Sequence, residues 1–506
     1  MERQRKEIKI GMMLNYLSMV IEGIVIFLLN PFITRSLGQE TYGVYTLMTS
    51  FTGYLSVFEF GLGTTIIRYI SKYNAEKDDK SRESFLSMCF IIYFFIALLM
   101  GVVAIILYKN IENFFANSLT VEQIILAKKM FIIIAISMTM TTVCSVFSAI
   151  ISGYEEFIFS RGLILCTAIL NVILTVIVLA TNATAIKLTY ITLIITIITI
   201  ISNVLFVSFK LKVKVKFHGW DKKFFEEIFK FSIFIFLQTI INQIYWRLDQ
   251  LIIGVKITNA AISLAIYAVA MKINDLVLAF TTVINRYQLP TITRLVLVEK
   301  DEEKLMTYLG KTSKFVAILY MVIIIGFIFF GMRFIEIYAG EGYELAYPIV
   351  LIVIISSALN RIHGCGSDVL KAKNLHGIYT TTIFVSAILN IIFTLILIPK
   401  IGIIGAAIGT AISVVIGNTI SYYWCLQVKA EINIKKLLYL TFKGFVPVIF
   451  ISVITGIALN YFMNNDFTNY LVKCVIFTIV YIITIYKFVL DKEDKDKILK
   501  KIFKRC

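Results

Sequence analysis

The chain has 506 residues, of which 59% are hydrophobic and only 16% are charged, and its formal net charge at pH 7 is +17. This composition is far too apolar for a soluble globular protein, and the apolar runs are long and regular. The sequence therefore predicts an all-α polytopic membrane protein. In such a protein the positive charge is explained first by membrane topology, and nucleic acid is not an expected partner. The cysteines and histidines are scattered singly without metal-ligand spacing, so no disulfide framework, metal or cofactor is expected.

Apolar segments that are long enough to cross a bilayer follow one another along the whole chain. A spanning helix needs roughly 20 apolar residues, and about fourteen segments satisfy this condition. In chain order they are residues 10–32, 44–67, 85–108, 124–151, 157–180, 188–209, 225–255, 260–284, 315–334, 345–365, 378–398, 401–426, 437–461 and 467–488. The first segment lacks a convincing small-residue cleavage site, so we expect it to remain as a helix rather than to be removed as a signal peptide.

Lysine and arginine residues gather in alternate loops. The basic regions are the leader 1–9, the loops 68–82, 210–230 and 286–314, and the tail 492–505. Cytoplasmic loops of membrane proteins are enriched in these residues, so the sequence predicts that both termini are cytoplasmic. The abundance of lysine, isoleucine and asparagine is typical of AT-rich prokaryotic genomes, which favours a prokaryotic cytoplasmic membrane. The basic tail is expected to lie on anionic membrane lipids.

Two segments that precede or open spans resemble each other. Leu37–Tyr45 precedes the second span, and Ile257–Tyr267 precedes or opens the eighth. An even number of spans separates them, so the two halves would be parallel repeats related by an axis along the membrane normal. The predicted organisation is two pseudo-symmetric six-helix bundles, residues 1–215 and 216–430, two additional transmembrane helices, residues 431–490, and a basic cytoplasmic tail, residues 491–506.

Charged side chains inside the spans are the first candidates for function. Arg247 and Asp249 lie in the seventh span, and Lys272 and Asp275 lie in the eighth. A charge at bilayer depth costs at least a few kcal/mol and normally faces a cavity or a partner. Lys272 and Asp275 are three residues apart and could instead neutralise one another. Arg247 and Asp249 are two residues apart and cannot face each other on one helix, so each is expected to find a partner elsewhere.

Other charged residues extend this set. Glu22 lies near the middle of the first span, where it could pair with the lysine of the eighth span. Glu59 lies in the cytoplasmic half of the second span, where a hinge or capping role is an equal alternative to a ligand role. Arg68, Arg286 and Arg361 lie at the cytoplasmic rim, where topology and snorkelling also explain them.

Polar residues at helical spacing form stripes on several spans. Examples are Thr52, Ser56, Glu59 and Gly63 in the second span, and Gln238, Asn242, Tyr245 and Asp249 in the seventh. Because such stripes put polar side chains on one face of each helix, they predict a polar cavity between the helices.

Three motifs narrow the class of membrane protein. They are Phe58–Gly63 followed by Ile67–Tyr73, Leu248–Gly254 with Tyr267–Ala270, and Pro399–Thr410. These motifs resemble those of the polysaccharide-biosynthesis flippases, the Wzx-type branch of the multidrug/oligosaccharidyl-lipid/polysaccharide (MOP) exporter superfamily. With the layout of spans, the resemblance covers nearly the whole chain and implies a fold similar to MATE transporters and MurJ.

The resemblance implies an alternating-access flippase, not an enzyme. It would translocate undecaprenyl-diphosphate-linked oligosaccharide units across the cytoplasmic membrane for surface polysaccharide biosynthesis, with other polysaccharide-assembly proteins as partners. By position, Arg247 and Lys272 would face the anionic head group, with Arg68, Arg286 and Arg361 at the mouth of the cavity. The carboxylates that would bind a coupling H+ or Na+ ion or act as gates are Glu22, Glu59, Asp249 and Asp275.

Two other functions in the same superfamily remain open. A cation-coupled antiporter of drugs or small molecules would prefer an acidic, aromatic-lined pocket to one with central cations. A lipid II flippase would carry a dense arginine cluster in the first two spans, which this sequence lacks. A membrane glycosyltransferase or polymerase is a different class and would need an acidic metal motif or a sizeable loop at the bilayer surface, and the sequence has neither.

Overall fold

The computed structural model describes residues 27–59, 62–181, 183–216, 236, 239–241, 243, 247–285, 288–464, 466–491 and 494–496. Within these residues all regular secondary structure is helical, which confirms the predicted all-α class. The chain divides into two compact units, Met1–Ala268 and Val269–Cys506, and the division falls inside helix α9. The predicted bundles of residues 1–215 and 216–430 stay a prediction, because residues 217–235 beside their boundary are not among those described.

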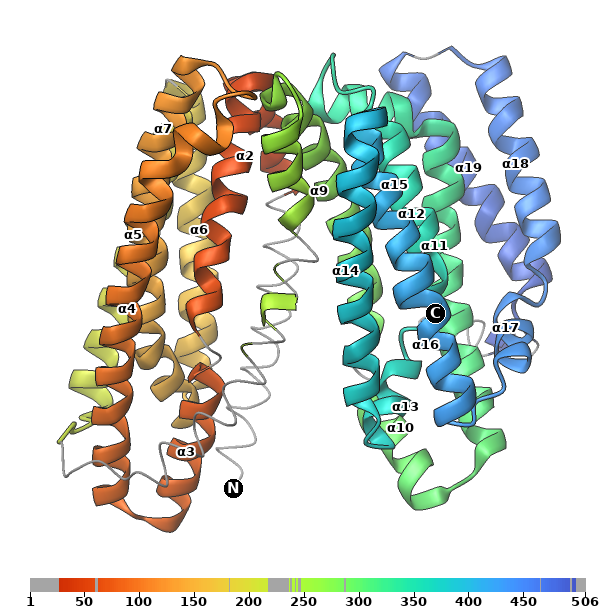
Figure 1. Ribbon diagram of the computed structural model, residues 1–506. Helices are drawn as coiled ribbons and strands as arrows, with labels where there is room; N and C mark the ends of the chain where they lie inside the picture. Colours follow the sequence, from red (N-terminus) through yellow and green to blue (C-terminus); the bar gives the residue numbers. More distant parts are fainter. Residues whose placement is uncertain are drawn as a thin grey trace, which may run out of the picture. The chain divides into compact units, whose positions relative to one another are not determined.

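The first unit is built of long helices around α5 (Figure 1). Its elements are α2 (Gln39–Gly53), the 3-10 helix η1 (Tyr54–Glu59), α3 (Leu62–Glu76), α4 (Asp79–Phe115), α5 (Val121–Gly153), α6 (Phe157–Thr181), α7 (Ala185–Leu205), the π-helical turn η2 (Phe206–Leu211) and the start of α9 (Ala260–Asn285). Helix α5 packs against α2, α3, α4 and α7. A capping box fixes its start, since the Thr120 hydroxyl accepts from the Gln123 backbone N–H and the Gln123 side chain accepts from the Thr120 backbone N–H.

The second unit continues with α9 and adds the C-terminal helices (Figure 1). Its further elements are α10 (Leu289–Arg294), η3 (Leu295–Glu299), α11 (Glu302–Ala339), α12 (Ala346–Ile362), α13 (Gly366–Ala372), α14 (His376–Ile401), α15 (Ile403–Ser413), η4 (Val414–Ile420), α16 (Ser421–Trp424), η5 (Cys425–Lys429), α17 (Ile434–Phe442), α18 (Phe445–Phe462) and α19 (Phe467–Phe488). Helices α14 and α15 approach so closely that a Cβ atom at Gly409 would lie 2.9 Å from the Thr394 backbone nitrogen. Small residues permit this close packing between membrane helices.

The predicted spans correspond to helices wherever the structure describes them. Among the described residues, 10 helices are long and apolar enough to cross a membrane, and the bent pair α12 and α13, which meet at 46°, raises the number to 11. The other three predicted spans, residues 10–32, 44–67 and 225–255, all include residues outside the described ranges. The structure therefore confirms a polytopic helical membrane fold, and the total of about fourteen spans stays a prediction.

One predicted span has the wrong start. The span predicted at residues 437–461 corresponds to α18, which begins only at Phe445. Leu437 belongs instead to the separate short helix α17, and its side chain is buried in the core of the second unit. Gly444 interrupts the helical conformation between α17 and α18, because its φ is +86°. A Cβ atom there would lie 2.1 Å from the Phe488 carbonyl oxygen, so the turn requires glycine for both its conformation and its space.

The starts of α4 and α11 support the predicted internal repeat. Each of these helices, 37 and 38 residues long, follows a lysine with positive φ and then an aspartate at the N-cap. The Asp78 side chain accepts from the Ser81 backbone N–H at 3.0 Å, and the Asp301 side chain accepts from the Lys304 backbone N–H at 2.9 Å. The same capped turn therefore opens the first long helix after α2 and the first long helix after α9.

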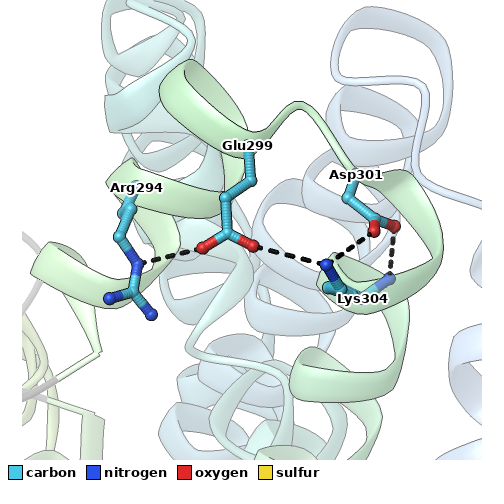
Figure 2. Close-up of polar contacts among 4 residues, drawn as sticks. All are labelled: Arg294, Glu299, Asp301 and Lys304. Carbon is cyan, nitrogen blue, oxygen red and sulfur yellow. Dashed lines mark hydrogen bonds and ion pairs between the residues drawn. The ribbon is translucent and has the colours of Figure 1, made fainter.

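A chain of ion pairs stabilises this turn in the second unit (Figure 2). Arg294 Nε lies 3.2 Å from Glu299 Oε1, and Lys304 Nζ lies 3.8 Å from Glu299 Oε2 and 3.2 Å from Asp301 Oδ2. The hydrogen bonds from the backbone and side chain of Lys304 lower the pKa of Asp301, and the same carboxylate raises the pKa of Lys304. The four side chains thus connect η3 to the first turn of α11.

The substitution Asp301→Ala is expected to lower thermal stability at pH 7, because it removes the cap of α11 and a member of the ion-pair chain. A carboxylate with a lowered folded-state pKa stabilises the fold above its unfolded-state pKa, about 3.9, and this contribution is lost as pH falls through the folded-state value. The difference in Tm between wild type and variant should therefore shrink at about pH 3.5. Thermal unfolding of the detergent-solubilised protein at both pH values checks this.

The matched control is Asp466→Ala. Asp466 occupies the N-cap of α19 but its side chain makes no capping hydrogen bond. A loss of stability in this control as large as in Asp301→Ala would contradict the role of the Asp301 hydrogen bonds.

Helix α2 and the start of α9 are in close backbone contact within the first unit. A Cβ atom at Gly43 would lie only 1.7 Å from the Ala261 carbonyl oxygen. The neighbouring backbone is also fixed, since the Ala260 N–H donates to the Ser118 carbonyl oxygen at 3.0 Å. Gly43 therefore sets how closely these two helices approach.

The substitution Gly43→Ala is expected to destabilise the protein by about 1–3 kcal/mol, because the two helices must separate to admit the methyl group. The control is Gly101→Ala in α4, where an added Cβ meets nothing within 4 Å. Alanine is favoured over glycine in a helix by roughly 0.5–1 kcal/mol, so the control should be neutral or slightly stabilising. Equal thermal stability of the two variants would refute the proposed close contact.

Candidate functional site

The guanidinium group of Arg247 lies against the C-terminal end of α2. Arg247 Nη1 donates to the Thr49 carbonyl oxygen at 3.1 Å. A Cβ atom at Gly53 would lie 2.4 Å from the same nitrogen, so only glycine leaves room for the guanidinium at this position. A charge-assisted hydrogen bond to the backbone offsets part of the cost of holding this cation inside an apolar segment.

Polar side chains on both sides of Arg247 continue this contact, so that Gln243, Arg247 and Gln250 form a seam with α2 and η1. Gln243 Nε2 donates to Ser56 Oγ at 2.8 Å, and the Ser50 hydroxyl donates to the Gln250 side-chain oxygen. Gln243 and Gln250 stand four residues before and three residues after Arg247, which is the spacing of side chains on one face of a helix. We call the contact formed by these side chains the polar seam.

Sequence reasoning missed most of the polar seam. It selected the stripe Gln238, Asn242, Tyr245 and Asp249, of which only Asp249 lies among the described residues. The spacing of Gln243, Arg247 and Gln250 was a visible signal for the neighbouring face. The sequence alone could not decide between two polar faces of one helix, because that choice depends on the helix opposite.

Asp249 is buried in the first unit, with 6% of its surface exposed. The Tyr267 hydroxyl, from the start of α9, donates to Asp249 Oδ2 at 2.5 Å, and Tyr267 is itself buried. The Tyr54 hydroxyl lies close enough to Arg247 and Asp249 for both charges to act on it. Within the described part of the chain this buried hydroxyl has no hydrogen-bond partner, so it can still bind a polar group.

A second acidic cluster in the first unit contains Glu59. The Glu59 carboxylate, at the end of η1, lies within hydrogen-bonding reach of the Ser145 hydroxyl of α5. Ser145 Oγ also lies 3.2 Å from the hydroxyl oxygen of Tyr93, a fully buried residue of α4. Three elements thus bring two hydroxyl groups beside a half-buried carboxylate, an arrangement able to bind a proton or a small cation.

The remaining predicted site residues fall in other places. Arg68 is exposed on α3 in the first unit. Lys272 and Asp275 are exposed on the part of α9 that belongs to the second unit, and Arg361 is half-buried in the last turn of α12. Glu22 and Arg286 lie outside the described residues. The structure therefore brings Arg247 and Asp249 into one cluster within one unit.

The fold defines the class of protein. It is similar to the structure of the lipid II flippase MurJ in its inward closed conformation, with a TM-score of 0.70 and 17% identity over 94% of this chain and 97% of that chain. It is also similar to an inward-facing multidrug resistance MATE family transporter of the MOP superfamily, with a TM-score of 0.65 and 14% identity over 82% of this chain and 95% of that chain. The fold is therefore that of the MOP transporters, as predicted.

The chain belongs to the polysaccharide biosynthesis protein family, whose model matches residues 32–348. A Shigella flexneri protein named as a candidate O-antigen transporter is 22% identical over 404 residues, 76% of this chain and 90% of that protein. An uncharacterized membrane protein of Methanocaldococcus jannaschii is 24% identical over the full length of both chains. The predicted membership of a polysaccharide-biosynthesis family is therefore confirmed, and the fold is that of a multi-pass membrane protein.

The substitution Tyr267→Phe is expected to destabilise the protein by about 1.5–3 kcal/mol, because it removes the hydrogen-bond donor from the buried Asp249 carboxylate and leaves its volume unchanged. Tyr190→Phe is the control, since Tyr190 is 49% exposed on α7. Thermal unfolding in detergent measures both variants. If Tyr267→Phe unfolds at the temperature of wild type, the short hydrogen bond does not stabilise Asp249.

Proposed function

We propose that this protein moves a lipid-linked glycan across the cytoplasmic membrane by alternating access, and that the carrier is undecaprenyl diphosphate. Membership of the polysaccharide biosynthesis family supports the glycan, and the name of the Shigella flexneri relative supports the transport of surface polysaccharide units. The basic loops support an orientation with both termini in the cytoplasm. Other polysaccharide-assembly proteins and anionic membrane lipids are the proposed partners.

The observation that carries the proposal is the Arg247 guanidinium in the polar seam. Moving a diphosphate through hydrocarbon unaided costs many kcal/mol, so a translocation path needs a cation and polar groups at bilayer depth. A planar guanidinium matches the oxygens of a phosphate better than an ammonium group does. The Tyr54 hydroxyl beside Arg247, which has no hydrogen-bond partner among the residues that the structure describes, supplies a further donor for such a group.

The other predicted residues have secondary roles in this proposal. Lys272 would bind the head group in a second state, and Arg68, Arg286 and Arg361 would attract it at the mouth of the path. Glu59, with the hydroxyl groups of Ser145 and Tyr93, is the coupling site that the geometry favours for H+ or Na+. Asp249 would act as a gate through Tyr267, and Glu22 and Asp275 remain coupling candidates.

Complementation of a bacterial strain that lacks its oligosaccharide flippase tests the proposal. Wild type is expected to restore surface polysaccharide, and Arg247→Ala is expected to lose most of that activity at equal membrane expression. Arg247→Lys should keep the charge but lose the bidentate geometry, and should therefore fall between them. Lys256→Ala is the matched control, because Lys256 is an exposed cation nine residues further along the chain and contributes nothing to the polar seam.

The possible outcomes test the flippase function and the role of Arg247 separately. If wild type fails to restore polysaccharide but confers drug resistance, the protein is an antiporter and the proposal is wrong. If Arg247→Ala restores polysaccharide as well as wild type does, the flippase function stands and the role of Arg247 does not.

A further inference from the structure

A groove of about 520 Å³ lies between α11 and α19 in the second unit. Its apolar part is formed by Phe315 and Ile318 of α11 and by Ile482 and Ile485 of α19. Phe315 and Ile482 are 55% and 59% exposed and form the rim, whereas Ile485 is buried. Both α11 and α19 are long and apolar enough to cross a membrane, so this groove runs between two candidate membrane spans.

One end of the groove is polar, and two lysines and one aspartate are the charged residues that line it among the described residues. Lys311 and Lys314 line it on α11, and Lys314 Nζ pairs with Asp491 Oδ2 at 3.1 Å. Lys495 Nζ lies 5.3 Å from the centre of the Tyr486 ring at the same end. Asp494 also lines the groove, so the charged side chains of its described lining are Lys311, Lys314 and Asp494, and Asp491 pairs with Lys314 from outside that lining.

The lysines lie next to the apolar wall on the same helix face. Residues 311, 314, 315 and 318 have the spacing of one face of a helix, so the ammonium groups and the apolar side chains of α11 line the same groove. The volume is within the range of ligand pockets, about 300–1,000 Å³. An amphipathic ligand with an anionic head and an apolar chain is complementary to the lysine end and the apolar wall of this groove.

We propose that this groove binds an anionic phospholipid from the leaflet that borders the basic loop 286–314. Its phosphate would contact Lys311 and Lys314, and one acyl chain would lie against Ile318, Ile482 and Ile485. Polybasic segments beside a membrane attract anionic lipids, and here the attraction is combined with a groove that holds the chain. The site does not depend on the proposed translocation function and is separate from the polar seam.

Native mass spectrometry of the full-length protein in detergent tests the proposal, with dioleoylphosphatidylglycerol as the probe and dioleoylphosphatidylcholine as the comparison. Lys311→Gln is expected to weaken retention of the anionic lipid about fivefold, the contribution of one lysine near an anionic membrane surface. Ile482→Trp should also reduce retention, because the larger side chain fills the rim of the groove.

Two controls are matched to these variants. Ile483→Trp changes the adjacent residue, which is 58% exposed but does not line the groove. Lys435→Gln removes an exposed lysine of α17 elsewhere in the same unit. Both should retain phosphatidylglycerol as wild type does, and thermal unfolding confirms that all four variants are folded.

Retention of phosphatidylglycerol at the wild-type level by both Lys311→Gln and Ile482→Trp would overturn the site. Equal retention of phosphatidylcholine by the wild-type protein would overturn the preference for an anionic head group. Loss of retention in Ile483→Trp would overturn the assignment to this groove.

Discussion

A guanidinium group inside an apolar span must have its N–H groups hydrogen-bonded, because an unsatisfied donor in hydrocarbon costs several kcal/mol. Much of the local structure of the first unit follows from this constraint on Arg247. The acceptor is a backbone carbonyl of α2, at Thr49, which has a second lone pair beyond the one used within the helix. Access to that carbonyl requires Gly53, and α2 ends at this glycine and continues as the tighter helix η1.

At a helix break in the second unit, side chains supply the hydrogen bonds that the backbone groups would otherwise lack. The turn between α12 and α13 leaves backbone groups without helical partners, and the Tyr422 hydroxyl donates to the His363 carbonyl oxygen at 2.7 Å. The His363 ring is fully buried and lies 3.1 Å from the Thr441 hydroxyl and 2.8 Å from the Tyr423 hydroxyl. Irregular backbone in a membrane protein is tolerated where protein groups hydrogen-bond it, and this turn meets that condition.

The apolar runs were enough to predict the helical class and the positions of most spans, because hydropathy determines whether a segment can enter a bilayer. They were not enough for the start of α18, since Lys443 and Gly444 are only two residues between apolar segments and the break depends on a contact with Phe488. Nor could they predict that Asp249 binds Tyr267, which is 18 residues away on another helix. Charge and spacing identified Arg247 as a candidate, but its partner on α2 is a property of the tertiary structure.

The turn at Gly444 has a mechanical consequence for the two C-terminal helices. Helices α18 and α19 are joined directly at one end by residues 463–466, and at the other end Gly444 lies against the carbonyl group of Phe488. The hairpin is therefore closed at both ends, and α11 contacts α17, α18 and α19. Such a closed hairpin cannot splay open without breaking the Gly444 contact, so these contacts favour α11, α18 and α19 moving together as one body.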